Sequence, residues 1–336
     1  MIDIAEESLS PVVPQPKQGF SRSIQRNPLG VVLDLPAWNF PYLTAVNALI
    51  PALMAGNSVV LKHASQTALC ADRLAAAALS ADLPAGVFST LDLNYTQTEA
   101  LVRSGAADFV CFTGSVFGGQ AIERAATESQ RFLGVGLELG GKDSAYVRTD
   151  ADLGFAIENI VDGAMFNSGQ SCCGIERVYV HRDLFDYFVE GAVTLIGMYQ
   201  LGDPTRSDTN LGPMVRKEAA AKVRAQINDA VKSGATAHID SEAFPEDAWG
   251  TPYLAPQLLT GVTHEMELMN EETFGPVIGV MPVDNDEQAI KMMNDSKYGL
   301  TSSIWTRDMT ATEQIAPRLE CGTVFMNRCD YLDPAL

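Results

Sequence analysis

The sequence predicts an α/β protein of two domains. Strand-like and helix-like segments alternate along nearly the whole chain, which is the pattern of parallel sheets covered by helices. The length of 336 residues exceeds that of one minimal domain and is that of two domains or of one large α/β unit. A hydrophobic content of 46% is sufficient for a large core. A glycine pair, Gly140-Gly141, follows the first series of strand–helix units and marks the best boundary between the domains.

The first half of the chain begins with 26 polar, proline-rich residues, which are more typical of an arm than of a domain start. Short apolar runs then predict strands at residues 30–35, 58–62, 86–92, 108–112 and 132–137. The segments between them predict helices at 42–55, 67–79, 96–104 and 118–128. Pro51 is expected to kink or break the first of these helices, because proline lacks the amide donor.

The second half repeats the alternation. Strands are predicted at residues 144–147, 177–181, 276–283, 301–305 and 322–326. Helices are predicted at residues 153–167, 184–198, 217–232, 286–294 and 311–319. We therefore expect an arm at 1–26, a first domain at 27–140 and a second domain at 141–336.

Composition excludes several classes of function. The formal net charge of −19 argues against nucleic acid or an anionic membrane as the main partner. The first ten residues lack the apolar core of a signal peptide, and no apolar run is long enough to span a bilayer. The six cysteines form no framework, which indicates free thiols in a reducing cytoplasm. The four histidines have no metal-ligand spacing, so no metal site is expected.

A glycine-bounded loop at residues 169–174, GQSCCG, follows a helical segment and contains two adjacent cysteines. A thiolate at Cys172 or Cys173 could attack an electrophilic carbon, and at most one of the pair is expected to face a substrate. A buried, inert thiol is the alternative. Upstream, Glu138 lies between two leucines in LELGGK, where a carboxylate can act as a base, or can form a strand-end salt bridge. A nucleophile and a base are the groups that two-step acyl chemistry needs.

Two segments that follow strands in the first half could bind a phosphate or a ribose. The segment FTGSVFGG at residues 112–119 ends a strand and opens a helix, although its spacing is not GxGxxG and an ordinary turn is the alternative. Lys62 closes a strand at the expected carboxyl edge of the sheet, with Ser65 one turn beyond it. Lys62 could instead extend its ammonium group into solvent.

Two further segments present groups suited to an oxyanion and to a cofactor. Asn39, in WNFP, could donate an amide hydrogen bond to a developing oxyanion, or could cap the following helix or occupy a turn. In EETFGPV, Glu272 could hold ribose hydroxyls while Phe274 packs on a flat ring. A solvated acidic turn is the alternative for this second segment.

In this order, the motifs WNFP, FTGS, LELGGK, the Gly-Gln-x-Cys loop, EETFGPV and NDSKYGLTSSIWTRD resemble the aldehyde dehydrogenase superfamily along nearly the whole chain. The resemblance implies a Rossmann-type cofactor domain, an α/β catalytic domain and an oligomerisation arm. It implies NAD(P)-dependent oxidation of an aldehyde to a carboxylic acid. Cys172 would attack the aldehyde, Asn39 and the Cys172 amide would stabilise the oxyanion, and Glu138 would activate the water that hydrolyses the thioester.

The resemblance also implies a set of cofactor-binding residues, namely Lys62, Ser65, Gly114, Ser115, Gly119, Leu139, Glu272, Phe274 and Trp38. Ser65 stands where relatives that prefer NAD often carry a glutamate, which would repel a 2′-phosphate. We therefore expect NADP to be accepted and preferred over NAD.

The resemblance implies a homo-oligomer, a dimer or a tetramer, if the chain is complete. The N-terminal helical segment and the C-terminal glycine-rich segment of relatives are expected to be missing, and Ala48 replaces a lysine that many relatives carry. A non-enzymatic protein of the same fold and an enzyme that passes the acyl group to coenzyme A are the alternatives, and Glu138 argues against the second. A cysteine hydrolase using His181 is disfavoured because nothing orients that histidine.

Overall fold

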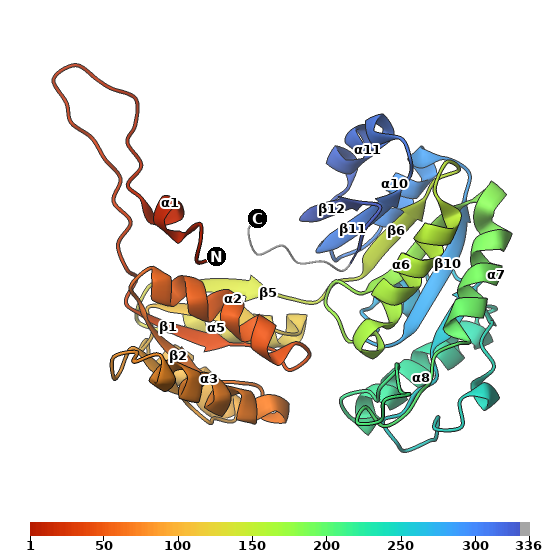
Figure 1. Cartoon of the computed structure of the whole chain (residues 1–336), viewed down its shortest axis with the longest axis horizontal. Coiled ribbons are helices and arrows are strands. Elements are labelled where there is room, and N and C mark those ends of the chain that lie inside the picture. Colours follow the sequence, from red (N-terminus) through yellow and green to blue (C-terminus); the bar gives the residue numbers. More distant parts are fainter. Residues whose placement is uncertain (330–336) are drawn as a thin grey trace. The chain divides into compact units, whose positions relative to one another are not determined.

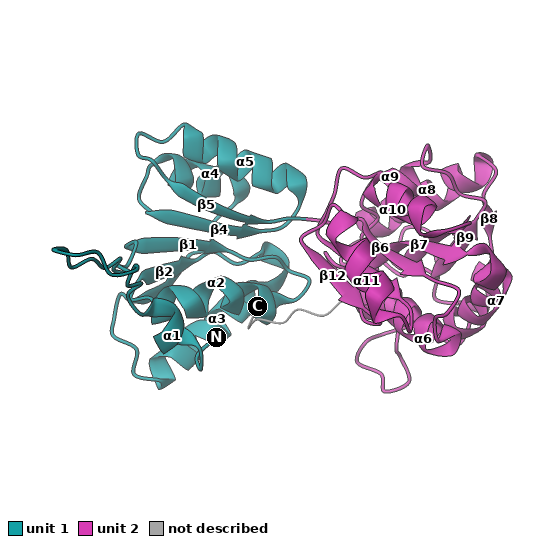
Figure 2. Cartoon of the chain, turned by 90° about the horizontal axis from the view of Figure 1, so that it is seen from above, with its two compact units in different colours: residues 1–139, 332–336 teal, residues 140–331 magenta. Residues whose placement is uncertain are grey.

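The computed structural model describes residues 1–329, which form two compact units that meet in sequence at Leu139 and Gly140 (Figure 2). Each unit consists of a largely parallel sheet with helices on both faces. The α/β fold class predicted from the alternating segments is therefore confirmed.

The first unit contains a five-stranded, all-parallel sheet in the order β3-β2-β1-β4-β5. Its strands are β1 (Val31–Leu35), β2 (Ser58–Leu61), β3 (Phe88–Thr90), β4 (Phe109–Thr113) and β5 (Gly134–Glu138). Helices α2 (Pro41–Met54) and α3 (Ala68–Ser80) cover one face, and α4 (Tyr95–Arg103) and α5 (Val116–Thr127) cover the other. The chain before β1 contains α1 (Ala5–Leu9) and an antiparallel bridge between Val12 and Ile24.

Helix α2 continues through Pro51 to Met54, so the predicted break at this proline is wrong. Proline removes the amide that would bond to the carbonyl of Asn47. Both Pro51 and Asn47 are exposed, so water can satisfy that carbonyl while the apolar face of the helix stays packed on the sheet.

The second unit contains a seven-stranded sheet in the order β12-β11-β6-β7-β10-β9-β8, in which only the β8–β9 pair is antiparallel. Its strands are β6 (Asp143–Val147), β7 (Ile175–His181), β8 (Thr236–Ala237), β9 (Gln257–Thr260), β10 (Val277–Val283), β11 (Thr301–Trp305) and β12 (Thr323–Met326). The prediction lacked β8 and β9, which are short and end a sheet.

Helices pack on the second sheet (Figure 1). On one face lie α6 (Leu153–Met165) and α7 (Phe185–Ile196), and on the other lie α10 (Asp286–Asn294) and α11 (Met309–Ile315). Helices α8 (Lys217–Lys232) and α9 (Glu267–Asn270) pack against β9 and β10. No helix among residues 1–329 has both the length and the hydropathy to cross a bilayer.

Candidate active site

The predicted residues of the first unit lie at the carboxyl edge of its sheet. Asn39 lies in the segment after β1, Lys62 directly follows β2, Ser115 follows β4, and Glu138 is the last residue of β5. Because these four strands are adjacent and parallel, the residues that follow them lie at one edge. The strand order reverses between β1 and β4, and such a switch point is where open α/β sheets bind ligands.

The loop from β4 to α5 is shaped for an anion. Ser115 is the N-cap of α5, and its Oγ accepts a hydrogen bond of 3.1 Å from the amide of Gly118. The first turn of α5 has no acidic residue, so the positive end of the helix dipole is not neutralised there. A Cβ at Gly119 would lie 2.6 Å from Leu139 Cδ2, so this glycine lets α5 approach the end of β5 closely.

Lys62 and Ser65 differ in exposure. The Lys62 side chain is buried and its Nζ lies 5.8 Å from the centre of the Tyr95 ring. Burial lowers the pKa of Lys62, and Asp92 opposes that shift. Ser65 is exposed at the start of a 3-10 helix, Ser65–Thr67. An ammonium and a hydroxyl in the segment after β2 are suited to a ribose that carries a phosphate.

The segment that carries Trp38 and Asn39 is hydrogen-bonded to the first turn of α2. The Thr44 hydroxyl lies 3.0 Å from the carbonyl of Ala37 and 3.0 Å from that of Phe40. Phe40 is the N-cap of α2, so the alternative interpretation of Asn39 as the helix cap is wrong.

Glu138 has an exposed side chain in the described structure, whereas Leu137 and Leu139 on either side are half-buried. The two leucines that flank Glu138 in the sequence therefore do not make its side chain buried. Alternation along β5 explains the difference, because neighbouring side chains point to opposite faces.

In the second unit the predicted residues lie at the amino edge of the sheet. Cys172 precedes β7 and Phe274 precedes β10, while Lys142, which is not a predicted site residue, precedes β6. These strands are adjacent in the order β6-β7-β10, so their amino ends meet at one edge. The elements at this edge are loops entering strands.

The backbone before Cys172 adopts an unusual conformation. Asn167, Ser168 and Gly169 have φ values of +53°, +56° and +68°, all in the left-handed region. A Cβ at Gly169 would overlap the backbone of Gly275, so only glycine fits this approach. Nothing in the sequence predicts a left-handed conformation for Asn167 and Ser168. Strained backbone of this kind is typical of functional sites.

Side chains then fix the loop in place. Ser168 Oγ donates a 2.7 Å hydrogen bond to the carbonyl of Gly212. Gln170 Oε1 accepts a 2.6 Å hydrogen bond from the amide of Val215. The glutamine of the Gly-Gln-x-Cys motif therefore has a structural role.

The two cysteines of the loop are not equivalent. Cys172 is half-buried, whereas Cys173 is only 3% exposed. Their sulfur atoms lie 3.8 Å apart, and Ser171 Oγ lies 4.0 Å from Cys173 Sγ. Accessibility therefore agrees with Cys172 as the thiol that a substrate can reach.

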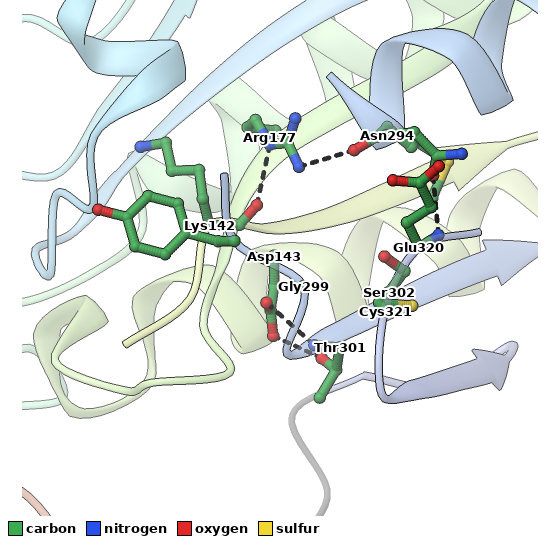
Figure 3. Close-up of a pocket in the computed structure, with 11 residues that line it drawn as sticks. Lys142, Asp143, Arg177, Asn294, Gly299, Thr301, Ser302, Glu320 and Cys321 are labelled. Atoms are coloured by element: carbon green, nitrogen blue, oxygen red, sulfur yellow. Dashed lines mark hydrogen bonds between the residues drawn. The ribbon is translucent and has the colours of Figure 1, made fainter. Parts of the chain in front are cut away.

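A small polar cavity of about 10 Å³ lies at this amino edge, and Figure 3 shows its lining. Asp143 accepts hydrogen bonds from the hydroxyl and the amide of Thr301, at 2.5 and 3.1 Å. Burial raises the pKa of Asp143 well above its usual value, while Thr301 opposes that shift. Arg177 donates a 2.8 Å hydrogen bond to the carbonyl of Lys142. The volume has room for about one water molecule.

The turn with Glu272 and Phe274 lies at the same edge. Burial raises the pKa of Glu272 to about 7, and the nearby Glu176 carboxylate adds to that shift. A Cβ at Gly140 would overlap the Glu272 carboxyl group, so the glycine pair leaves room for it. Glu176 and its contacts were not predicted, because the residue lies inside a strand and belongs to no motif.

Two other features lie apart from the predicted residues. A hollow of about 570 Å³ is lined by nine residues between Glu123 and Val135 of the first unit, including exposed Phe132, and none of them is a predicted site residue. Within residues 1–329, no group of three or more His, Cys, Asp or Glu side chains is placed to hold a metal ion.

Comparison with known proteins decides the family. A model described as the aldehyde dehydrogenase family matches residues 1–335. The chain belongs to the aldehyde dehydrogenase family. The resemblance predicted from the motifs is therefore confirmed, and the protein is an oxidoreductase.

Named relatives of this aldehyde dehydrogenase include an aldehyde dehydrogenase from Paenarthrobacter nicotinovorans, 38% identical over 99% of this chain and 72% of that protein. The NADP(+) succinate-semialdehyde dehydrogenase 1 of Mycobacterium bovis is 36% identical over 95% of this chain and 69% of its own length. A succinic semialdehyde dehydrogenase from Streptococcus pyogenes, solved in complex with NADP+, has a TM-score of 0.93 at 29% identity, covering 99% of this chain and 72% of that one.

Proposed function

We propose that this aldehyde dehydrogenase oxidises an aldehyde to a carboxylic acid through covalent intermediates on Cys172. The half-buried Cys172 beside the buried Cys173 is the observation that carries the proposal. The thiolate adds to the aldehyde carbon, which forms a C–S bond and converts the carbonyl oxygen to an oxyanion. A bound nicotinamide cofactor supplies the hydride acceptor, and the acyl group is left as a thioester on Cys172.

Two residues of the first unit complete the proposed chemistry. The Asn39 amide and the Cys172 backbone amide donate hydrogen bonds to the oxyanion. Glu138 accepts a proton from the water that attacks the thioester, which releases the acid and restores the Cys172 thiolate. Asn39 follows β1 and Glu138 ends β5, at the carboxyl edge of a parallel sheet.

The first unit carries groups that fit a dinucleotide. Ser115 and the N-terminus of α5 suit the pyrophosphate, with Gly114 and Gly119 giving the turn its close packing. Lys62 and Ser65 suit a ribose that carries a 2′-phosphate. Trp38, Leu139, Glu272 and Phe274 complete the proposed cofactor residues. NADP is the preferred cofactor, in line with the names of two relatives.

Cofactor preference is tested at Ser65. A Ser65→Glu variant would place a carboxylate near the 2′-phosphate, so kcat/KM with NADP should fall by about tenfold or more while the value with NAD changes little. Ser65→Ala is the matched control, because it removes the hydroxyl without adding charge. A wild-type preference for NAD of more than about tenfold in kcat/KM would contradict the proposal.

The proposed reaction is tested with a panel of aldehydes that includes succinate semialdehyde, because relatives are named for that substrate. Reduced cofactor and free acid should form in equal amounts, with or without coenzyme A. A thioester product in the presence of coenzyme A would identify the acylating alternative. NADP binding without reduced cofactor from any aldehyde would favour the non-enzymatic alternative.

The organisation of the whole protein is also part of the proposal. The segment at 1–26 would serve as an oligomerisation arm, residues 27–140 as the cofactor domain and residues 141–336 as the catalytic domain, of which 330–336 lie outside the described residues. A cytoplasmic dimer or tetramer is the expected assembly. Sedimentation of the chain with and without residues 1–26 tests the role of the arm.

A further inference from the structure

The turn at residues 271–276, which carries Glu272 and Phe274, is held by a buried carboxylate. Glu176, the second residue of β7, is 4% exposed. Its Oε1 accepts a 2.8 Å hydrogen bond from the amide of Phe274. The Thr273 amide lies 3.1 Å from the same oxygen and 2.9 Å from Oε2. Two successive backbone amides of the turn are therefore directed at one carboxylate.

Lys142 neutralises this carboxylate inside the protein. Its Nζ lies 2.5 Å from Glu176 Oε2 and donates a 3.0 Å hydrogen bond to Thr273 Oγ1. The Lys142 and Glu176 side chains are 0% and 5% exposed. A buried carboxylate needs both an opposite charge and hydrogen-bond donors, and here the donors come from the turn.

The bound carboxylate stabilises a strained conformation. Phe274 has a φ of +52°, which bulky side chains rarely adopt. Successive amides that converge on an anion form a nest, and the anion favours the backbone conformation that creates it. The strain at Phe274 is thus balanced by hydrogen bonds to Glu176.

The same turn fixes Glu272. The Glu272 carboxyl group accepts a hydrogen bond from the Gly141 amide, beside the glycine pair that precedes Lys142. On the other side, Lys222 donates a 3.2 Å hydrogen bond to the Glu272 carbonyl. Since Glu272 and Phe274 flank Thr273, a displacement of the Thr273 and Phe274 amides would move both neighbours.

We propose that Glu176, neutralised by Lys142, is a positioning residue that fixes Glu272 and Phe274 for the nicotinamide ribose of NADP. This inference rests on the proposed function, in which Glu272 and Phe274 are cofactor-binding residues. Glu176 acts through the turn and does not itself touch the cofactor.

The pH dependence of NADP binding separates positioning from general stability. The charged groups that face Glu272 are Glu176 on β7, Lys142 before β6 and Lys222 on α8, and burial is the largest cause of its raised pKa. Ionised Glu272 accepts the ribose hydroxyl hydrogen bonds, so NADP binding should strengthen as pH rises through its pKa of about 7. Removal of the Glu176 charge should move this transition to lower pH.

The decisive variant is Glu176→Gln, which keeps the shape and one acceptor oxygen. Calorimetry should show that the dissociation constant for NADP rises by about tenfold or more. Hydrogen exchange at the Thr273 and Phe274 amides should accelerate, while the rate of Cys172 alkylation by iodoacetamide should stay within about twofold of wild type. Asp286→Asn is the matched control, because Asp286 lies on α10 and pairs with Arg148 and Tyr146 instead of the turn amides. This variant should leave NADP binding unchanged.

A dissociation constant within about twofold of wild type in Glu176→Gln, with an unshifted pH transition, would overturn the positioning role. If the single variant does not fold, the neutral double variant Lys142→Met/Glu176→Gln supplies the same measurements, because it leaves no unpaired buried ammonium. A wild-type protein that binds NADP but oxidises no aldehyde would contradict the proposed function alone, and the binding comparison would still decide the role of Glu176.

Discussion

The two units place their predicted residues at opposite edges of their parallel sheets. In the first unit, Lys62 and Ser115 follow strands, at the edge where a helix begins. In the second unit, Cys172 and Phe274 precede strands, at the edge where loops enter the sheet. The first edge offers a helix N-terminus to an anion, as in other open α/β sheets.

The amino edge has no such ready-made site, and the second unit builds one from its backbone. Three consecutive left-handed residues precede Ser171 and the two cysteines, with Gln170 between, and a buried Glu176 holds the 271–276 turn. In the first unit, by contrast, side chains such as Leu139 set the close approach of α5. The second unit therefore depends on the backbone conformation around Cys172, whereas the close approach at Gly119 in the first unit is made to a side chain.

The largest expected effect tests the backbone contact in the second unit. Gly169→Ala should lower the free energy of unfolding by about 3 kcal/mol and abolish most activity, because the new Cβ overlaps the Gly275 backbone at a left-handed φ. Gly250→Ala is the control, since Gly250 has a φ of +79° and open space around it. That control should lose only about 1 kcal/mol in urea unfolding. Equal losses of unfolding free energy in the two variants would show that the close approach of Gly169 to Gly275 does not contribute to stability.

A second test compares buried carboxylates. Asp34 is 2% exposed, its Oδ2 has no hydrogen-bond partner among the described residues, and burial raises its pKa well above the usual value. Glu176, by contrast, is fully partnered. Asp34→Val should therefore raise the free energy of unfolding at neutral pH by about 1–3 kcal/mol.

The sign of the pH dependence follows from the raised pKa. The folded state holds the Asp34 proton more tightly than the unfolded chain, so wild-type stability falls as pH rises above the unfolded pKa of about 4. The increase in the free energy of unfolding produced by Asp34→Val should therefore be smaller below that pH. Asp108→Asn should instead lower the free energy of unfolding at neutral pH, and this loss should shrink at acidic pH. The reason is that the Val31 amide and Arg131 lower the pKa of Asp108. Thermal unfolding across acidic and neutral pH checks both, and a loss of stability in Asp34→Val would contradict this account.

The smallest effect tests side-chain packing in the first unit. Gly119→Ala should lower the free energy of unfolding by about 1 kcal/mol, because its Cβ would lie 2.6 Å from Leu139 Cδ2. Adding Leu139→Ala removes the obstructing atoms. The double variant should lose at least about 0.5 kcal/mol less unfolding free energy than the sum of the two single variants. Additive losses would show that the Leu139 side chain moves away from the new Cβ without cost.

The sequence was sufficient for features that depend on alternation and on strand ends. Lys62, Ser115 and Glu138 were found because polar residues after apolar strands stand at the ligand edge of a parallel sheet. The residue types of the cysteine loop and of the 271–276 turn predict candidate sites, and the family resemblance then assigns the roles of Cys172, Glu272 and Phe274. The family comparison confirms that resemblance.

Features that depend on tertiary packing could not be predicted. Glu176 lies between Ile175 and Arg177, and only the fold shows that a buried lysine and two amides meet its carboxylate. The left-handed conformations of Asn167 and Ser168 have no sequence signature. Asp34 did carry a signal, because a charge stands inside the apolar run VVLDL. The exposure of Glu138 could not be predicted from its leucine neighbours, because successive side chains in a strand face opposite sides.

The central claim is that Cys172, and not Cys173, is the nucleophile. The most direct measurement is aldehyde-dependent NADPH formation by wild type, Cys172→Ala and Cys173→Ala at matched NADP occupancy. The account predicts that Cys172→Ala forms no NADPH while it still binds NADP, and that Cys173→Ala keeps most of the wild-type rate. Full activity in Cys172→Ala, or its loss only in Cys173→Ala, would contradict the account.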